Sequence, residues 1–299
     1  MDYVIETNNL TKQYPRKLAV DSVSMHVSKG DIYGFIGKNG AGKTTTMKMI
    51  LGLTTPTKGE IRLFGSDDLN AGRRKIGSLI EAPALYKGES AIENLRRFGI
   101  LYETSEKEIE KVLGIVGLGG TGNKAVKTFS LGMIQRLGIA LSLLGGPEIL
   151  ILDEPINGLD PAGIKDVRDI ILMLNKEYGV TFLIASHILD ELGKIATRYG
   201  IINNGVLVEE IGADELRARC QHGIIVKVND TNKAQEVLRA NGYEDVEIKE
   251  GNRIKITTDV ENQAKINTLL ITEGIEVSES TVQSEGFEDY FIERLGKMI

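Results

Sequence analysis

Eight consecutive residues of this chain have the types and the spacing needed to hold a chain of phosphates. They read Gly37-Lys38-Asn39-Gly40-Ala41-Gly42-Lys43-Thr44 and fit the pattern G-x-x-x-x-G-K-[ST]. Glycines let the backbone turn so tightly that successive N–H groups point inward, and a following helix adds the positive end of its dipole. Lys43 is expected to reach the β and γ phosphates of a nucleotide, and the Thr44 hydroxyl to bind Mg²⁺. Nucleotide binding is therefore the first hypothesis.

The elements that must position this segment are visible on both sides of it. The apolar stretch from Ile32 to Ile36 predicts a buried strand before the loop, and Thr45 to Gly52 predicts a helix after it. The alternative is a Gly-rich turn that merely joins a strand to a helix. The filled pattern positions and the strand-then-helix setting argue against that alternative.

Two acids follow a second apolar run and are suited to act on bound phosphates. The run from Ile149 to Leu152 predicts another buried strand, and Asp153 and Glu154 stand at its carboxyl end, where open α/β sheets bind ligands. Asp153 is suited to bind Mg²⁺, directly or through water, and Glu154 to polarise the attacking water. Solvated acids in an ordinary turn are the alternative.

Two further groups have the chemistry to contact a phosphate. His187 follows a third apolar run, Val180 to Ile184, and is placed to donate to the γ-phosphate; the alternative is a structural histidine beside a helix that Ser186 caps. Ser130 and Gly132 lie in a turn that opens a helix, which makes a second anion site. If each anion site is half of a composite one, ATP lies between the phosphate loop of one copy and the Ser130 turn of another.

The order of the elements predicts an α/β domain. Short β-like runs alternate with helical stretches from Val4 to about Ile211, which is typical of a mainly parallel sheet. Alternating segments near the N-terminus predict an antiparallel edge layer, and the region from Asn70 to Gly146 predicts mostly helices, with a helical subdomain at about residues 85–146. The elements expected in these two regions are Tyr3–Asn8, Leu18–Val27, Ala91–Leu101, Glu106–Val116 and Met133–Leu144.

A change of pattern marks a second, smaller domain. After a charged helix near Ala213–Gln221, the predicted element order is β-α-β-β-α-β, the split βαβ arrangement. We therefore expect an ATP-binding domain over residues 1–215 and a small α+β regulatory or interaction domain over residues 216–299. The expected elements of the smaller domain are Gly223–Val228, Asn232–Ala240, Glu244–Lys249, Arg253–Thr257, Val260–Thr272 and Ile275–Val282, followed by an amphipathic segment at Phe287–Leu295.

Composition excludes some classes of protein. The chain has 299 residues, 41% of them apolar, and a formal net charge of −6, which argues against nucleic acid as a partner. The N-terminus lacks the basic start and apolar core of a signal peptide, and no run of about 18 or more apolar residues occurs. One cysteine, Cys220, can form no internal disulfide, which favours a reducing compartment. These features predict a cytoplasmic protein that acts at a membrane only through another polypeptide.

Residues 1 to about 215 resemble the nucleotide-binding subunit of an ATP-binding cassette (ABC) transporter. Gly37–Thr44 matches the Walker A motif, and Ile149–Glu154 matches the Walker B motif with the catalytic glutamate. Asn157–Asp160 matches the D-loop, His187 the switch histidine, and Tyr14 falls where the family stacks an aromatic ring on adenine. The resemblance implies ATP contacts from Tyr14, Gly37, Lys38, Asn39, Gly40, Ala41, Gly42, Lys43, Thr44, Thr45, Ser130, Gly132 and Asp160.

The sequence departs from the family pattern at two places. The family signature, usually Leu-Ser-Gly-Gly-Gln, reads Phe129-Ser130-Leu131-Gly132-Met133, so Leu131 puts a side chain where the backbone nears phosphate. At the Q-loop, Glu81 stands in place of glutamine, and its carboxylate can still accept from metal-bound water. Together with the C-terminal extension, these departures resemble the branch that exports peptide antibiotics such as bacitracin and lantibiotics.

The resemblance implies an ATPase on the inner face of the cell membrane. Such a subunit pairs with a second ATP-binding subunit, here expected as a homodimer, and drives an integral membrane permease. The implied cofactors are ATP and Mg²⁺. The implied catalytic residues are Glu154, His187 and Lys43, and the implied metal ligands are Thr44, Asp153 and Glu81.

Other functions remain open at this point. One is a soluble cassette ATPase that acts on ribosomes or DNA, which the single cassette and the acidic balance make a weak candidate. Another is an ABC-type ATPase, not a transporter, whose C-terminal domain senses a ligand or regulates the enzyme.

Overall fold

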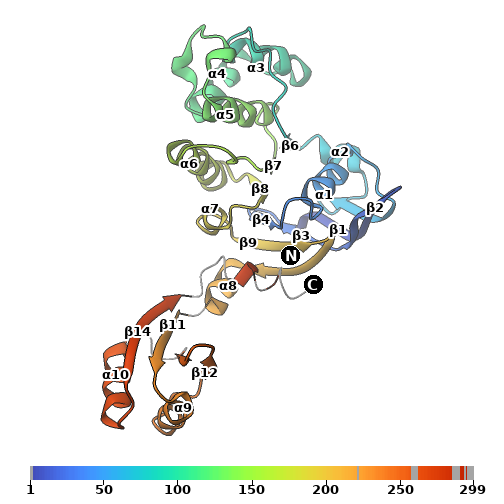
Figure 1. The fold of residues 1–299 in the computed structure, drawn as a ribbon. Helices are drawn as coiled ribbons and strands as arrows, with labels where there is room; N and C mark the ends of the chain where they lie inside the picture. Colours follow the sequence, from blue (N-terminus) through green and yellow to red (C-terminus); the bar gives the residue numbers. More distant parts are fainter. Residues whose placement is uncertain (1–2, 221, 257–261, 285–289, 293, 295–299) are drawn as a thin grey trace. The chain divides into compact units, whose positions relative to one another are not determined.

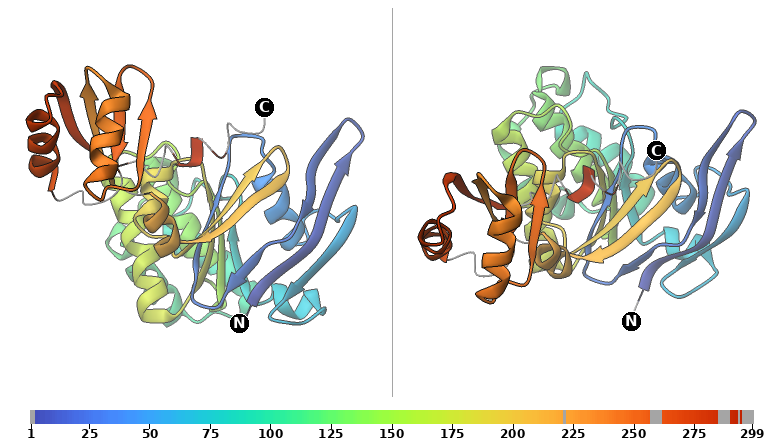
Figure 2. Two further views of the ribbon diagram at one scale, coloured as in Figure 1. Left: turned by 90° about the horizontal axis from the view of Figure 1, so that it is seen from below. Right: turned by 60° about the horizontal axis from the view of Figure 1, so that its bottom comes forward.

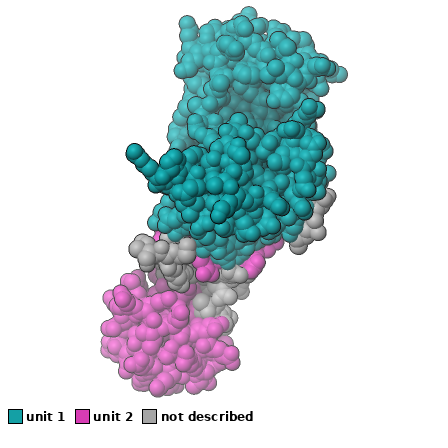
Figure 3. All heavy atoms as spheres, turned by 90° about the vertical axis from the view of Figure 1, so that its right-hand side faces the viewer, with its two compact units in different colours: residues 1–213 teal, residues 214–299 magenta. Residues whose placement is uncertain are grey.

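The computed structural model describes residues 3–220, 222–256, 262–284, 290–292 and 294. The chain divides into two compact units, Met1–Ala213 and Asp214–Ile299, which Figure 3 shows in different colours.

A six-stranded sheet forms the centre of the first unit. In spatial order its strands are β10 (Val206–Gly212), β9 (Arg198–Asn203), β4 (Ile32–Ile36), β8 (Thr181–Ser186), β7 (Ile149–Asp153) and β6 (Ile76–Leu79). All neighbours pair in parallel except β10, which runs antiparallel to β9 at one edge. Every residue of β4, β7 and β8 is buried, as expected for strands covered on both faces. The three apolar runs therefore lie side by side, with their carboxyl ends at one edge of the sheet.

Helices cover both faces of this sheet. Figure 1 shows α6 (Pro161–Tyr178) and α7 (Leu189–Gly193) on one side, and α1 (Lys43–Ile50) and α2 (Leu69–Arg73) on the other. The ends of α6 follow from its sequence: Asp160 caps the first turn, Pro161 occupies the first helical position, and Gly179 ends the helix in the left-handed region. The predicted helix after the phosphate loop is confirmed as α1.

An antiparallel sheet packs beside the α1 face and confirms the predicted edge layer. Its strands are β1 (Tyr3–Tyr14), β2 (Lys17–Val23), β3 (His26–Ser28) and β5 (Lys58–Leu63). The prediction of a single strand over Leu18–Val27 is wrong, because β2 ends at Val23 and β3 begins only at His26. At the break the Thr7 hydroxyl donates to the carbonyl of Val23 at 3.0 Å, and the Met25 N–H donates to that hydroxyl at 2.9 Å. A side chain thus satisfies backbone groups where the ladder stops.

Three helices form a group beside the edge strand β6 of the sheet (Figure 1). They are α3 (Ala91–Gly99), α4 (Glu106–Ile115) and α5 (Leu131–Ser142), and they confirm the three helices predicted here. The region is mostly helical, as predicted, but it also contains the strand β6, which the sequence did not predict. A short apolar run cannot be assigned by periodicity alone. Only glycine fits at position 77 of this strand, because a Cβ there would lie 1.8 Å from the carbonyl oxygen of Ser142 in α5.

The second unit has its own sheet and its own apolar core, seen from two further sides in Figure 2. Its strands β12 (Val246–Lys249), β13 (Arg253–Ile256), β11 (His222–Val228) and β14 (Val277–Ser284) pair antiparallel in that spatial order. With α9 (Thr231–Ala240) and α10 (Gln263–Thr272) between them in sequence, this is the predicted split βαβ arrangement. The charged helix before this sheet is α8 (Ala213–Arg219). Parts of the predicted segments Arg253–Thr257, Val260–Thr272 and Phe287–Leu295 lie outside the described residues.

Candidate functional site

The phosphate-loop residues form a tight turn between β4 and α1. Gly42 adopts φ +112°, and a Cβ there would lie 2.7 Å from the carbonyl oxygen of Ala19. A Cβ at Gly37 would lie 2.4 Å from the carbonyl oxygen of Ile202. Because real side chains do not tolerate such contacts, only glycine fits at these two positions.

Lys43 lies inside this turn. The residue is 5% exposed, its Nζ donates to the carbonyl oxygen of Gly37 at 2.6 Å, and Glu154 Oε1 lies 3.4 Å from Nζ. A phosphate oxygen is a stronger partner for an ammonium group than a neutral carbonyl is. Lys43 is therefore held where an incoming phosphate can replace its contact with Gly37.

Thr44 and Asp153 meet where α1 begins and β7 ends. The Thr44 hydroxyl donates to Asp153 Oδ2 at 2.7 Å, and the other oxygen, Oδ1, is buried without a hydrogen-bond partner. Burial raises the pKa of Asp153, and the hydrogen bond from Thr44 opposes that rise. A hydroxyl beside an unpartnered carboxylate oxygen is a donor set that Mg²⁺ accepts. The residues present thus fit the metal that the sequence predicts.

Glu154 and His187 form a pair at the ends of β7 and β8. His187 Nδ1 lies 2.8 Å from Glu154 Oε2, while Glu154 Oε1 is buried and has no hydrogen-bond partner. The backbone N–H of Glu154 donates to the Ala185 carbonyl at 2.9 Å, and its φ of +50° is unusual for a residue with a side chain. Backbone strain of this kind concentrates at functional sites. One carboxylate oxygen is therefore held by His187, and the other lies 3.4 Å from Lys43 Nζ beside the phosphate loop.

The alternative for His187 supposed that Ser186 caps a helix beside it. That part of the alternative is wrong, because Ser186 caps no helix. Its hydroxyl accepts from the Ile188 N–H at 3.0 Å, and α7 begins only at Leu189, with no side-chain cap. The polar segment after β8 is thus a turn that carries His187 to Glu154.

A cavity of about 200 Å³ opens beside the phosphate loop. Its lining includes Lys17, which the sequence interpretation missed and whose Nζ donates to the Gly40 carbonyl at 3.2 Å. The sequence signal that could have identified it is the basic pair Arg16-Lys17, which follows Tyr14 in the turn between two predicted strands. The residues that line the cavity are Lys17, Ala19, Lys38, Asn39, Gly40, Gly42, Lys43, Thr44, Thr45 and Glu154.

Tyr14 lies at the end of β1 and outside the lining of this cavity. The residue is 41% exposed, and Lys12 Nζ lies over its ring at 5.1 Å from the centroid. In the β1–β2 hairpin Tyr14 pairs with Lys17, the residue that reaches Gly40. The hairpin therefore connects the predicted adenine-stacking residue to the phosphate loop.

Glu81 is held by a lysine. Its carboxylate lies 2.6 Å from Lys48 Nζ on α1, and the hydrogen bond from Lys48 lowers the pKa of Glu81. The Glu81 side chain is 67% exposed, and its charge also contributes to the raised pKa of Asp153. The direct contact of Glu81 is therefore with Lys48, on the helix that begins at the phosphate loop.

The other predicted ATP contacts lie away from the cavity. Ser130 caps α5, where its hydroxyl accepts from the Met133 N–H at 3.3 Å, and Asp160 caps α6 by accepting from the Gly163 N–H at 3.0 Å. The two helix starts are neighbours, because a Cβ at Gly132 would lie 3.8 Å from Gly163 Cα. The lining of the phosphate cavity includes neither of them, nor the tip of the D-loop.

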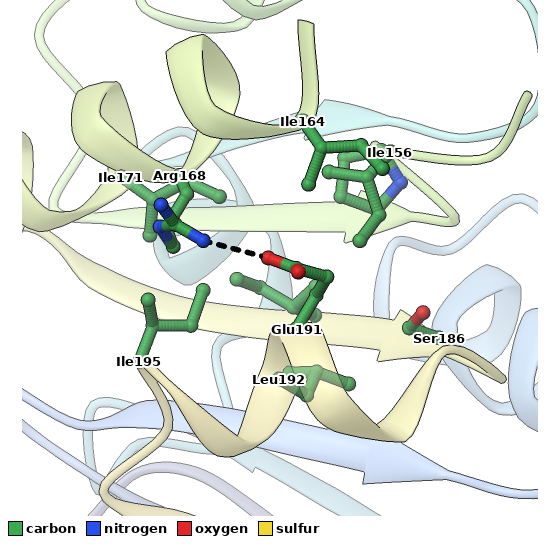
Figure 4. Close-up of a pocket in the computed structure, with 10 residues that line it drawn as sticks. Ile156, Ile164, Arg168, Ile171, Ser186, Glu191, Leu192 and Ile195 are labelled. Atoms are coloured by element: carbon green, nitrogen blue, oxygen red, sulfur yellow. Dashed lines mark hydrogen bonds and ion pairs between the residues drawn. The ribbon is translucent and has the colours of Figure 1, made fainter. Parts of the chain in front are cut away.

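A small gap of about 20 Å³ lies between α6 and α7 (Figure 4). Arg168 donates to Glu191 Oε2 at 2.8 Å across it, and Ile156 and Ser186 are among the residues that line it. Hydrogen bonds from Lys194 and from Arg168 lower the pKa of Glu191. The gap is too small for a nucleotide, and the ion pair ties the helix that follows His187 to α6.

Comparison with known proteins identifies the family. Residues 20–157 match the model described as ABC transporter. The chain is 42% identical over 301 residues to the bacitracin transport ATP-binding protein BcrA of Bacillus licheniformis, covering 99% of this chain and 98% of that protein. It is 45% identical over 207 residues to the lantibiotic transport ATP-binding protein SrtF of Streptococcus pyogenes, covering 69% of this chain and 90% of that protein.

A solved structure agrees with these relatives. The dimeric structure of MJ0796, a bacterial ABC transporter cassette, is 25% identical, covers 70% of this chain and 98% of that chain, and superposes with a TM-score of 0.63. The phosphate loop and the Asp153-Glu154 pair belong to the matched region, and Lys43, Thr44 and Glu154 meet at one cavity. This chain belongs to the ATP-binding proteins of the ABC transporter family, which bind and hydrolyse ATP.

Proposed function

We propose that this chain hydrolyses ATP to drive export of a peptide antibiotic through a separate membrane permease, conferring immunity or resistance. The observation that carries the enzymatic part is the arrangement of Asp153 and Glu154. Each carboxylate has one oxygen bound by Thr44 or His187 and one buried oxygen without a hydrogen bond, beside the loop that holds Lys43. The substrate class is supported by similarity to the bacitracin and lantibiotic transport proteins.

The proposed reaction is attack of water on the γ-phosphorus of ATP. The bond from the γ-phosphorus to the β–γ bridging oxygen breaks, and ADP and phosphate form. Glu154 Oε1 aligns and polarises the water, Lys43 neutralises the phosphates, and the loop amides hold them. Because an ionised carboxylate only accepts, His187 Nδ1 donates to Glu154, and this hydrogen bond would orient the ring toward the γ-phosphate.

Mg²⁺ is proposed as the metal of this site. Thr44 Oγ1 and Asp153 Oδ1 would hold it, and Glu81 would act through water. Bound there, the metal supplies positive charge to the phosphates. Thr44 lies at the start of α1, Asp153 at the end of β7 and Glu81 in the turn after β6.

A second copy of the chain is proposed to complete the ATP site. Ser130 and Gly132 begin a helix whose N-terminus can attract phosphate, yet they lie outside the cavity of their own chain. A homodimer that closes head-to-tail brings this turn, with Asp160 beside it, to the phosphate loop of the partner. Hydrolysis removes the γ-phosphate that both copies hold and so favours reopening.

A permease is proposed as the membrane partner, and the chain would then lie in the cytoplasm on the inner face of the membrane. Within the described residues, no helix has the length and apolar character that crossing a bilayer requires. A cavity of about 360 Å³ is lined by β6, by the turn after it and by residues near the end of α3. Two of its lining residues, Leu101 and Tyr102, are 77% and 54% exposed. Such an apolar surface fits a permease segment.

The smaller domain is proposed as an accessory domain over about residues 216–299. The BcrA alignment covers 99% of this chain and so includes that domain, whereas the SrtF alignment covers 69%. One transport relative thus aligns with the smaller domain, whereas the alignment with the other covers a shorter part of the chain. This favours the transporter subunit over a ligand-sensing ATPase that is not a transporter.

The test of the enzymatic part is Glu154→Gln. We expect the variant to keep ATP binding and to lose at least about a hundredfold in turnover, because the amide cannot accept a proton from water. ATP binding is measured by calorimetry and hydrolysis by phosphate release, with the exposed Glu177→Gln as the matched control. Hydrolysis near the wild-type rate in Glu154→Gln would remove the role assigned to this carboxylate.

The test of the transport part is made in membranes. The tagged chain should co-purify with a polytopic membrane protein, and co-expression of the two should raise the bacitracin concentration that cells tolerate. The Glu154→Gln chain should co-purify equally and give no such protection. Equal tolerance with wild-type and variant chains would contradict ATP-driven export of this peptide.

A further inference from the structure

Lys17 stands at the phosphate loop because its strand is fixed there. Ala19, two residues along β2, is buried, and its carbonyl oxygen is the group that a Cβ at Gly42 would meet at 2.7 Å. The Gly205 carbonyl also accepts from the Asp21 N–H at 2.8 Å. Residues two apart in a strand point to the same face, so Lys17 and Ala19 face the loop together. Both line the cavity beside it.

The charge of Lys17 is not balanced by an acid. Its contact is the neutral Gly40 carbonyl at 3.2 Å, and in the described part of the chain it forms no ion pair. Lys43, in contrast, already has Glu154 at 3.4 Å. The cavity thus has three lysines, with Lys38 as the third, and one carboxylate in its lining. A polyanion is the ligand that such a lining attracts.

We propose that Lys17 binds phosphate oxygens of the nucleotide as a second lysine, opposite Lys43. Lys17 gives up the neutral Gly40 carbonyl for a charged oxygen, which makes the stronger hydrogen bond. Because Tyr14 pairs with Lys17 across the hairpin, one short hairpin contacts both ends of the nucleotide. This inference rests on the proposed phosphate-binding role of the loop.

The test compares two neighbouring basic residues in the full chain. Lys17→Met and Arg16→Met remove the same charge from the same exposed turn, but Arg16 is not part of the cavity lining. We expect Lys17→Met to weaken ATP binding about tenfold, or about 1.4 kcal/mol, and Arg16→Met less than about twofold. Lys17→Arg should restore binding. Calorimetry with magnesium ATP gives the affinities, and thermal unfolding without nucleotide should be unchanged.

Inorganic tripolyphosphate, which has no base or sugar, is the second probe. As a competitor of labelled ATP it should lose about as much affinity for Lys17→Met as ATP itself does. Equal ATP affinities of Lys17→Met and Arg16→Met, or unchanged inhibition by tripolyphosphate, would overturn the assignment. Failure of the wild-type chain to bind ATP would instead overturn the proposed function of the loop.

Discussion

Two helix N-termini of the first unit have the same local chemistry and different surroundings. The loop before α1 is enclosed: glycine is required at Gly42 by a neighbouring carbonyl at 2.7 Å, and Lys43 is 5% exposed. The turn before α5 is open: a Cβ at Gly132 would meet no atom nearer than 3.8 Å, and Leu131 is 52% exposed. Both helix N-termini have the dipole that favours anions, but only the first is enclosed by neighbouring parts of the chain.

The difference shows what turns a helix N-terminus into a binding site. Around α1, the backbone of β2 and of β9 packs against Gly42 and Gly37. Asp153 at the end of β7 and Glu154 directly after it add two carboxylates. At α5 the capping hydroxyl of Ser130 is already engaged with its own helix. The second N-terminus can therefore take part in ATP binding only when another molecule brings the phosphate to it.

The largest expected effect comes from adding one methyl group to each turn. Gly42→Ala should lower the affinity for ATP more than about a hundredfold, because the φ of +112° and the nearby Ala19 carbonyl leave no room for a Cβ. Gly132→Ala should leave ATP binding by a single copy unchanged and lower steady-state hydrolysis, because in the proposed homodimer the partner's phosphate approaches this helix start. Calorimetry and phosphate release measure the two effects. Equal loss of binding in both variants would remove the distinction between the turns.

Ser130 provides the next largest effect and separates capping from phosphate binding. Aspartate caps a helix as well as serine does, so Ser130→Asp should keep the thermal stability, whereas Ser130→Ala should lose about 1 kcal/mol. The carboxylate should repel ATP and cut hydrolysis by at least about tenfold below the rate of Ser130→Ala. If hydrolysis instead follows stability in the two variants, the turn is structural only.

Asp153 gives a smaller effect, on stability and its pH dependence. Because burial raises its folded pKa above the unfolded value, the folded protein binds the proton more tightly, and this residue costs stability once it is ionised. Asp153→Asn should therefore unfold at the same or a higher temperature than wild type at neutral pH. The gain should vanish as the pH falls below the ordinary range for aspartate, about 3.9. A lower unfolding temperature at neutral pH would contradict the assigned cost.

Glu81 gives the smallest effect, because its carboxylate is exposed and paired with Lys48. Glu81→Gln should raise the Mg²⁺ concentration for half-maximal hydrolysis by no more than about threefold, as expected for an exposed ion pair. Hydrolysis measured against magnesium concentration tests this. A rise of more than about thirtyfold would instead indicate a direct metal ligand.

The amino-acid sequence determined the local parts of this protein. The loop from Gly37 to Thr44, the acids after the Ile149 strand and the Ser130 helix start are each specified by residues close together in the chain. Glycine spacing, apolar runs and capping residues act over a few positions, so they can be read without a structure. The order of elements in the smaller domain was predicted for the same reason.

The tertiary structure decided which of these parts meet. It brought Glu154 to His187 and Thr44 to Asp153, and it added Lys17, because sheet pairing joins residues that are distant in the chain. It also placed β6 in the sheet, where the partner strand and not the periodicity of the residues selects the conformation. The physical reason is that burial and pairing depend on neighbours in space, which no local pattern contains.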